Sequence, residues 1–121
     1  MIKGIGSDLI RIERLRRPLG KPHFVERVFT GAERALLAAS GDPVTFAAGR
    51  WAAKEAVAKA LGGGFAGCPP GAISVERGDR GEPVVRFVGA SPLAPGDRVL
   101  VTLTHEGDYA ADFAVVEGGN P

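Results

Sequence analysis

The chain has 121 residues, of which 45% are apolar and 24% charged, with a net charge of +1. This size predicts one domain with a single core, residues 1–121, and the near-neutral balance disfavours a general nucleic-acid-binding protein. No apolar run reaches the roughly 18–20 residues of a membrane span, no signal peptide is recognisable, and the single cysteine cannot form an internal disulfide, so we expect a cytoplasmic protein with no membrane partner.

The first ten residues predict a strand that breaks at Gly6-Ser7-Asp8, which would place Asp8 at the strand end. Ile12 and Leu15, three residues apart among arginines, predict a short amphipathic helix that stops near Pro18. The basic face of this helix would be exposed to solvent.

A basic stretch overlaps this helix. Between Arg11 and Arg27, six basic residues stand against two acidic ones, a net charge of +4. A local cationic surface of this kind attracts an acidic partner, although a simple solvated helix face explains it equally well. Nucleic acid is disfavoured as the partner because aromatic residues for base stacking are not interleaved through this stretch, where Phe24 is the one aromatic, and because the rest of the chain is acidic.

Two longer helices are predicted next. Thr30 and Glu33 match a capping box that opens a helix running to about Ala39. The segment 44–61 contains no proline and is rich in alanine, with apolar residues at helical spacing, and is predicted to be the central helix. Glu55 and Lys59 are four residues apart, so they share a face of this helix that points away from the apolar stripe.

The second half of the chain changes to the period of two that is typical of strands. Residues 72–76 and 83–88 predict a hairpin around the Gly78–Gly81 turn, and residues 99–105 and 109–117 predict two further strands. The fold class is therefore α+β: an antiparallel sheet with a long central helix, in which helices come early and strands late.

Asp8 and Glu55 suggest a metal site if the fold brings them together. Two ionised carboxylates repel each other unless a divalent cation compensates them, and Mg²⁺ is commonly held by one or two carboxylates together with substrate phosphates. Lys59 would supply a positive charge for a phosphate, and Gly62 to Gly64 would let a ligand approach the backbone closely. Each residue also has a structural explanation: a turn or cap for Asp8, an exposed ion pair for Glu55 and Lys59, and a helix C-cap for the glycines.

Four segments, in order, carry a family resemblance: Gly4-Ile-Gly-Ser-Asp8-Leu-Ile, Phe24-x-x-Arg27-x-Phe-Thr30-x-x-Glu33, Phe46-x-x-x-Arg50-Trp-Ala-Ala-Lys54-Glu55-Ala-x-x-Lys59-Ala-Leu-Gly62, and Leu103-Thr-His105. Together they resemble the holo-acyl-carrier-protein synthases, the small class of 4′-phosphopantetheinyl transferases. The resemblance covers residues 2 to about 117 and implies the phosphopantetheinyl transferase fold. It implies transfer of 4′-phosphopantetheine from coenzyme A to a serine of apo acyl carrier protein, with Mg²⁺ as cofactor and release of adenosine 3′,5′-bisphosphate.

The resemblance also implies roles for individual residues. Asp8 and Glu55 match magnesium ligands, and Glu55 is the candidate acceptor of the serine proton. The implied coenzyme A contacts are Arg50, Lys59, Gly62, Gly64 and His105, with Lys59 also counted among the catalytic residues. Arg14, Arg27 and, less securely, Arg17 match the basic surface that meets the acidic carrier. Taken by itself, a lone histidine such as His105 is more often structural.

A single unit of this family offers only part of a cleft, so the resemblance implies a homotrimer with three interfacial sites. The sequence departs from the family between Val88 and Val99, where a short, proline-rich segment replaces a helix. Two other classes remain open on the residues alone. A non-catalytic carrier-binding module would keep the basic surface without turnover, and a metal-dependent nucleotide hydrolase would keep Asp8 and Glu55 without needing a carrier.

Overall fold

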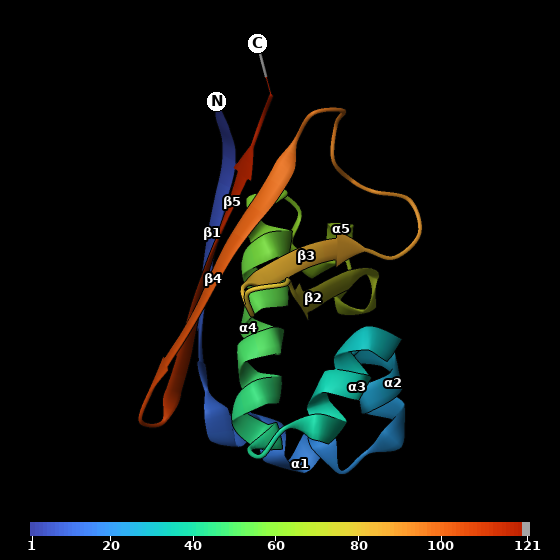
Figure 1. The fold of residues 1–121 in the computed structure, drawn as a ribbon, viewed down its shortest axis with the longest axis vertical. Helices are drawn as coiled ribbons and strands as arrows, with labels where there is room; N and C mark the ends of the chain where they lie inside the picture. The colour runs from blue at the N-terminus through green and yellow to red at the C-terminus, as the bar shows by residue number, and fades with distance from the viewer. Residues whose placement is uncertain (120–121) are drawn as a thin grey trace.

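Helix α4 (Pro43–Ala60), 18 residues long, lies between two antiparallel sheets in the computed structural model, which describes residues 1–119. Strands β1, β5 and β4 form a layer along one side of α4, and the β2–β3 hairpin crosses the helix on the other side (Figure 1). The helices α1, α2 and α3 gather at the end of α4 where that helix begins, whereas α5 lies near its other end (Figure 1). The predicted α+β class is therefore confirmed.

The elements follow one another in a simple order. The strands are β1 (Ile2–Arg11), β2 (Ile73–Arg77), β3 (Pro83–Phe87), β4 (Arg98–Glu106) and β5 (Tyr109–Glu117). The helices besides α4 are η1 (Ile12–Leu15), α1 (Arg16–Leu19), α2 (Pro22–Val28), α3 (Gly31–Ala39), α5 (Gly64–Gly67) and η2 (Pro70–Ala72). The predicted hairpin is confirmed, and the two further predicted strands are present and pair with each other. The helices α2 and α5 are additions to the prediction, and residues 88–97 contain no helix.

The predicted break of the first strand at Gly6-Ser7-Asp8 is wrong, because β1 continues to Arg11 and pairs with β5 throughout that segment. The two glycines have a packing role instead. A Cβ atom at Gly4 would collide with the carbonyl oxygen of Ala60, and one at Gly6 with that of Ala56. Glycine therefore allows the backbone of α4 to lie directly on β1, as strand glycines often do. Asp8 lies within the strand and not at its end.

Helix α4 is buried on nearly all sides. Its alanines at 47, 48, 52, 53, 56 and 58 are fully enclosed, which explains why the helix can be clasped between two sheets. The predicted apolar stripe is thus one part of a wider buried surface. Small side chains let both sheets approach the helix closely. The hydrophobic core has two clusters of buried residues, one around the start of α4 and one around its end.

A buried ion pair joins three elements. The predicted capping box at Thr30 and Glu33 is present, and the Glu33 carboxylate also lies 2.7 Å from Lys54 Nζ and accepts a 2.7 Å hydrogen bond from the backbone amide of Val75. Lys54 Nζ donates further hydrogen bonds to the carbonyls of Pro70 and Ile73. Both charged side chains are inaccessible to solvent. This network connects α3, α4 and β2.

Among residues 1–119, no helix has both the length and the apolar character needed to cross a bilayer.

Candidate functional site

The fold brings Asp8 and Glu55 to the same cavity. On β1, the residues at alternate positions 4, 6, 8 and 10 face α4, and Gly6 lies against Ala56. Asp8, two positions further along the strand, therefore also faces this part of the helix, on which Glu55 directly precedes Ala56. Both side chains line a cavity of about 270 Å³. Its remaining lining consists of Leu9, Ile10, Arg14, Leu15, Pro18, Phe24 and Trp51.

The two carboxylates influence each other through space. Partial burial raises the pKa of Glu55, and the charge of Asp8 raises that pKa further, while Lys59 lowers it. A neighbouring cation would relieve this repulsion and favour the ionised form of Glu55. Asp8 and Glu55 have no third metal-ligating side chain beside them, since no group of three or more such side chains is found within residues 1–119. Two carboxylates suit Mg²⁺, which commonly completes its coordination with water and phosphate oxygens.

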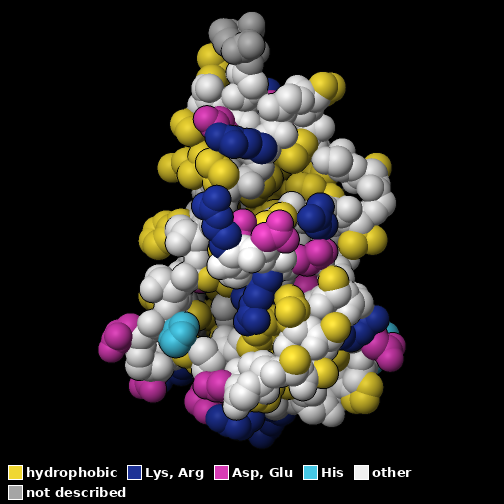
Figure 2. All heavy atoms as spheres, in the orientation of Figure 1, with side chains coloured by type: hydrophobic (Ala, Val, Ile, Leu, Met, Phe, Trp, Pro, Cys, Tyr) yellow, Lys and Arg dark blue, Asp and Glu magenta, His cyan; other side chains and the backbone are white. Residues whose placement is uncertain are grey.

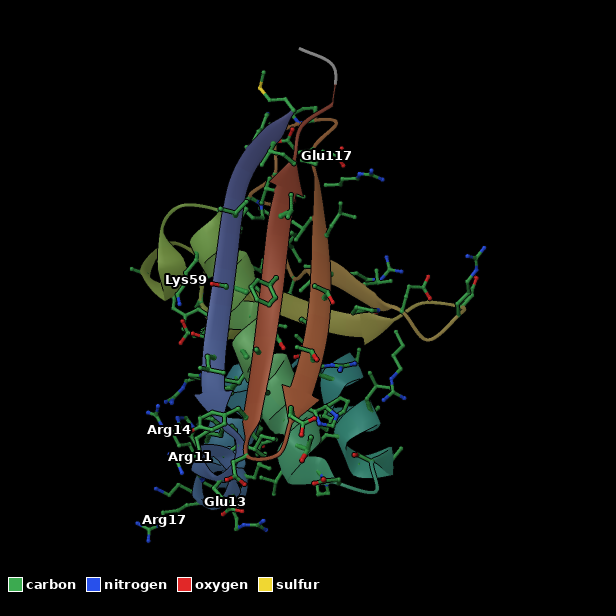
Figure 3. All side chains as sticks on the ribbon, turned by 90° about the vertical axis from the view of Figure 1, so that its left-hand side faces the viewer. Arg11, Glu13, Arg14, Arg17, Lys59 and Glu117 are labelled. Atoms are coloured by element: carbon green, nitrogen blue, oxygen red, sulfur yellow. The ribbon has the colours of Figure 1, made fainter. Side chains whose placement is uncertain are left out.

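Lys59 lies at the same edge of the sheet as Asp8. Its side chain is labelled in Figure 3, and its ammonium group contacts Asp8 Oδ1 at 3.1 Å and donates a 3.0 Å hydrogen bond to the backbone carbonyl of Ser7. The side chain is about half exposed, so it remains free to move onto an anion. Gly62 and Gly64 follow at the end of α4, and both adopt positive φ angles (104° and 59°), a conformation that glycine adopts readily.

Arg50 and His105 lie elsewhere, at the opposite edge of the sheet. The strand order is β1-β5-β4, so β5 separates the strand that carries Asp8 from the strand that carries His105. Arg50 projects from α4 toward the β4 side and donates a 3.1 Å hydrogen bond to the carbonyl of Val75. A cavity of about 340 Å³ is lined by both Arg50 and His105. The site residues expected from the sequence therefore form two groups in one chain, one at each edge of the sheet.

Two of the three basic residues expected to meet a carrier lie at the β1 edge, and the third lies on α2. Arg14 and Arg17 project from the segment that follows β1, below Lys59 in Figure 3, and Arg27 is in the last turn of α2. All three are exposed, and within residues 1–119 none forms an ion pair. Arg16, by contrast, is paired with Glu13 at 2.7 Å. The unpaired guanidinium groups are thus available to an acidic partner.

One buried carboxyl escaped the sequence-based prediction. Asp112 lies in the middle of β5, paired with Asp8 on one neighbouring strand and with Leu103 on the other. It is fully buried, and neither carboxylate oxygen has a hydrogen-bond partner. The pattern offered an indication, because positions 110, 114 and 116 on the same face are Ala, Ala and Val, so an aspartate at 112 interrupts an apolar row.

Burial raises the pKa of Asp112 to about 7, with the amide of Thr104 and the charge of Arg50 opposing that rise and Asp8 adding slightly to it. We therefore expect Asp112 to make the protein less stable as the pH rises from about 4 to about 7. Over this range the carboxyl ionises in the unfolded chain but holds its proton in the folded one. Above pH 7 the loss is complete, and below pH 4 it is absent.

Replacing Asp112 with alanine should therefore flatten the pH dependence of stability. Between pH 4.5 and pH 8, the wild-type protein should lose on the order of 3 kcal/mol more than the variant in the free energy of unfolding. Urea unfolding at the two pH values measures this difference. Parallel losses in both proteins would contradict a raised pKa at this position.

Comparison with known proteins yields a consistent result. A family model described as the 4′-phosphopantetheinyl transferase superfamily matches residues 4–114. The holo-[acyl-carrier-protein] synthase of Desulforudis audaxviator is 40% identical, with 98% of this chain and 95% of the relative covered. The corresponding synthase of Aromatoleum aromaticum is 41% identical, with coverages of 97% and 98%.

Solved structures agree with the sequence relatives. A holo-(acyl-carrier-protein) synthase from Bacillus anthracis, crystallised in complex with CoA (3′,5′-ADP), superposes with a TM-score of 0.83 at 34% identity, covering 98% of this chain and 99% of that one. The synthase from Neisseria meningitidis gives a TM-score of 0.83 at 30% identity, with coverages of 97% and 99%. The similarity extends over nearly the whole length of each protein.

Proposed function

Because the chain belongs to the 4′-phosphopantetheinyl transferase superfamily, we propose that it transfers 4′-phosphopantetheine from coenzyme A to a serine of an apo acyl carrier protein, as a holo-acyl-carrier-protein synthase. Adenosine 3′,5′-bisphosphate is the other product. The observation that carries this proposal is the meeting of Asp8 and Glu55 in one cavity, within a fold that matches synthases along its whole length. The whole of residues 1–121 would act as one transferase domain, in the cytoplasm where coenzyme A is available.

Asp8 and Glu55 would hold the magnesium ion. Their mutual repulsion, seen in the raised pKa of Glu55, is what a divalent cation offsets, and two carboxylates leave room for phosphate oxygens. When bound, the ion supplies charge neutralisation for the pyrophosphate of coenzyme A and for the developing negative charge on the leaving group. Lys59, which contacts Asp8 in the structure, would provide a second positive charge that binds the phosphates.

The transfer itself is an in-line displacement at phosphorus. The serine oxygen forms a bond to the β-phosphorus of coenzyme A while the bond from that phosphorus to the bridging oxygen breaks, which releases adenosine 3′,5′-bisphosphate. Glu55 is our candidate to receive the serine proton, because it lines the cavity beside Asp8 and its carboxylate is ionised when a cation is bound there. The chain's other contribution is to position the two substrates.

The carrier would dock at the β1 edge. Arg14 lines the cavity that contains Asp8 and Glu55, Arg17 follows it on α1, and Arg27 would contribute from the last turn of α2. An acidic carrier helix on this surface would present its serine to the carboxylate pair.

We further propose that three copies assemble in a ring and that each site is completed by a neighbouring copy. One chain carries Asp8, Glu55 and Lys59 at the β1 edge and Arg50 and His105 at the β4 edge, which suits a head-to-tail contact that closes on itself. The outer face of the sheet supports this assembly, because no helix covers it (Figure 3) and it exposes several large apolar side chains: Ile5, Leu9, Leu100 and Phe113.

Mixing two inactive variants should restore activity if the sites are shared. In trimers formed at random from equal amounts of Asp8→Asn and His105→Ala chains, about one quarter of the interfaces would combine an intact Asp8 with an intact His105. Coexpressed chains should therefore recover roughly one quarter of wild-type transfer, whereas each variant alone should be nearly inactive. No recovery in verified mixed assemblies would show that each site lies within one chain.

The direct test of the activity uses a purified apo carrier. Incubation with the protein, coenzyme A and Mg²⁺ should increase the carrier's mass by one phosphopantetheine and release adenosine 3′,5′-bisphosphate. Binding of the carrier without a gain in mass would indicate a non-catalytic module. Cleavage of coenzyme A that needs no carrier would indicate a hydrolase.

A further inference from the structure

The ion pair of Lys59 differs from ordinary pairs on the surface of this molecule. Figure 2 shows basic and acidic side chains lying side by side on one face, and exposed pairs of that kind contribute little beyond local charge balance. Lys59 instead contacts Asp8, a carboxylate that lines the same cavity as Glu55. Its charge therefore acts directly on the proposed metal site.

Two oxygen atoms hold the ammonium group of Lys59 at the edge of β1. Nζ lies 3.1 Å from Asp8 Oδ1 and donates a 3.0 Å hydrogen bond to the carbonyl of Ser7. Glu55 is four residues earlier on α4, the spacing typical of a helical ion pair, yet Lys59 reaches across to β1, and Glu55 has no ion-pair partner within residues 1–119. Lys59 thus compensates one of the two carboxylates that together suit a divalent cation.

Lys59 has room to leave this position. Its side chain is 48% exposed, whereas that of Asp8 is 18% exposed. Lys59 also lines a second cavity, of about 600 Å³, whose other walls come from residues 5–7 of β1 and 113–115 of β5. Because a lysine carries its charge on a flexible four-carbon stem, the ammonium group can exchange Asp8 for a nearby phosphate without any change in the backbone.

We propose that Lys59 competes with the divalent cation for Asp8 and thereby makes metal binding depend on coenzyme A. This inference rests on the proposed function. The ammonium group and the cation are attracted to the same carboxylate and repel each other, so Asp8 favours one of them at a time. The phosphates of coenzyme A attract Lys59 away from Asp8 and also offer oxygen ligands to the metal. Metal and coenzyme A therefore strengthen each other's binding.

Metal binding without turnover tests this competition. Mn²⁺ prefers the same oxygen ligands as Mg²⁺, and its binding can be titrated by electron paramagnetic resonance. Without coenzyme A, Lys59→Met should bind Mn²⁺ about three- to tenfold more tightly than wild type, because a modestly held competitor and its charge repulsion are both removed. With saturating coenzyme A and no carrier, the two proteins should agree within about twofold, so the coupling between metal and coenzyme A falls by the same factor.

Two further variants separate competition from a general effect of charge. Lys59→Arg keeps the charge and the reach of the side chain and should stay within about twofold of wild type under both conditions. Arg14→Met removes a positive charge from the lining of the cavity, but Arg14 pairs with neither carboxylate within residues 1–119. Its gain in Mn²⁺ affinity without coenzyme A should therefore be less than about twofold.

Two results would overturn the proposal: Lys59→Met that binds Mn²⁺ no more tightly than wild type, or Arg14→Met that gains as much affinity as Lys59→Met. The proposed function is tested separately. If wild-type protein transfers nothing to a carrier, the proposed function fails, while tighter Mn²⁺ binding by Lys59→Met would still establish the competition at Asp8. No Mn²⁺ binding by either protein, with or without coenzyme A, would refute the metal site and the competition together.

Discussion

Changing Asp8 to asparagine or Glu55 to glutamine should lower kcat/KM for phosphopantetheine transfer on the order of 1000-fold, because each change removes one of the two carboxylates proposed to hold magnesium at the reacting phosphates. The amide is close in size to the acid but carries no charge, so the cavity keeps its shape. The magnesium concentration needed for half-maximal rate should rise in both variants. Transfer measured by mass spectrometry of the carrier, at several magnesium concentrations, provides both quantities.

Measuring the free energy of unfolding distinguishes loss of the metal site from loss of the fold in these variants. Removing one carboxylate relieves their repulsion, and the half-exposed Asp8–Lys59 ion pair contributes little, so the free energy of unfolding should change by no more than about 0.5 kcal/mol. Asp79→Asn, an exposed acid in the turn between β2 and β3, is the matched control and should keep full activity. Near-normal transfer in folded Asp8→Asn and Glu55→Gln would refute the metal roles of both residues.

Changing Lys54 to methionine should destabilise the protein by about 3–5 kcal/mol, because it leaves the Glu33 carboxylate buried without its cation. Lys54 follows Arg50 by one helical turn and precedes Glu55 directly, yet it points into the core and not toward the cavity. Burial lowers the pKa of Lys54, and the Glu33 carboxylate opposes that shift. The positive charge of Lys54 therefore depends on its buried partner. Chemical denaturation measures the loss.

A second lysine on the same helix provides the control. Lys59→Met removes a half-exposed ion pair and should change stability by no more than about 0.5 kcal/mol. The double variant Glu33→Gln with Lys54→Met should recover part of the loss, since no unpaired charge then stays in the core. If Lys54→Met is as stable as Lys59→Met, the buried pair contributes nothing measurable to folding.

The proposed sharing of each site has a physical origin in the strand order. Asp8 and His105 lie on strands separated by β5, and α4 fills the space between the two edges on the inner face. Lengthening one side chain cannot bridge that distance, whereas a neighbouring copy can present its β4 edge to the first copy's β1 edge. Asp112 lies between these two edges, where Asp8 on one side and Arg50 on the other act on its pKa.

Local patterns were sufficient to predict much of the fold. The capping box at Thr30 and Glu33, the alanine-rich central helix and the turns at Gly78–Gly81 and Gly107 depend on neighbours within a few residues, and those neighbours are visible in the sequence. The resemblance added Asp8 and Glu55 as partners, which periodicity alone could not establish.

Tertiary packing decided what local patterns could not. Gly4 and Gly6 favour a turn in isolation, but they lie in a continuous strand because β5 supplies their hydrogen-bonding partner and α4 packs against their bare backbone. In the sequence, Lys54 and Asp112 look like ordinary charged residues. In the fold, Lys54 is buried against Glu33, and Asp112 is buried in the middle of the sheet. The sequence by itself determined the elements and the chemical groups available. The contacts between distant segments determined which groups are buried, which are paired and which face a cavity, because burial and charge compensation depend on those contacts.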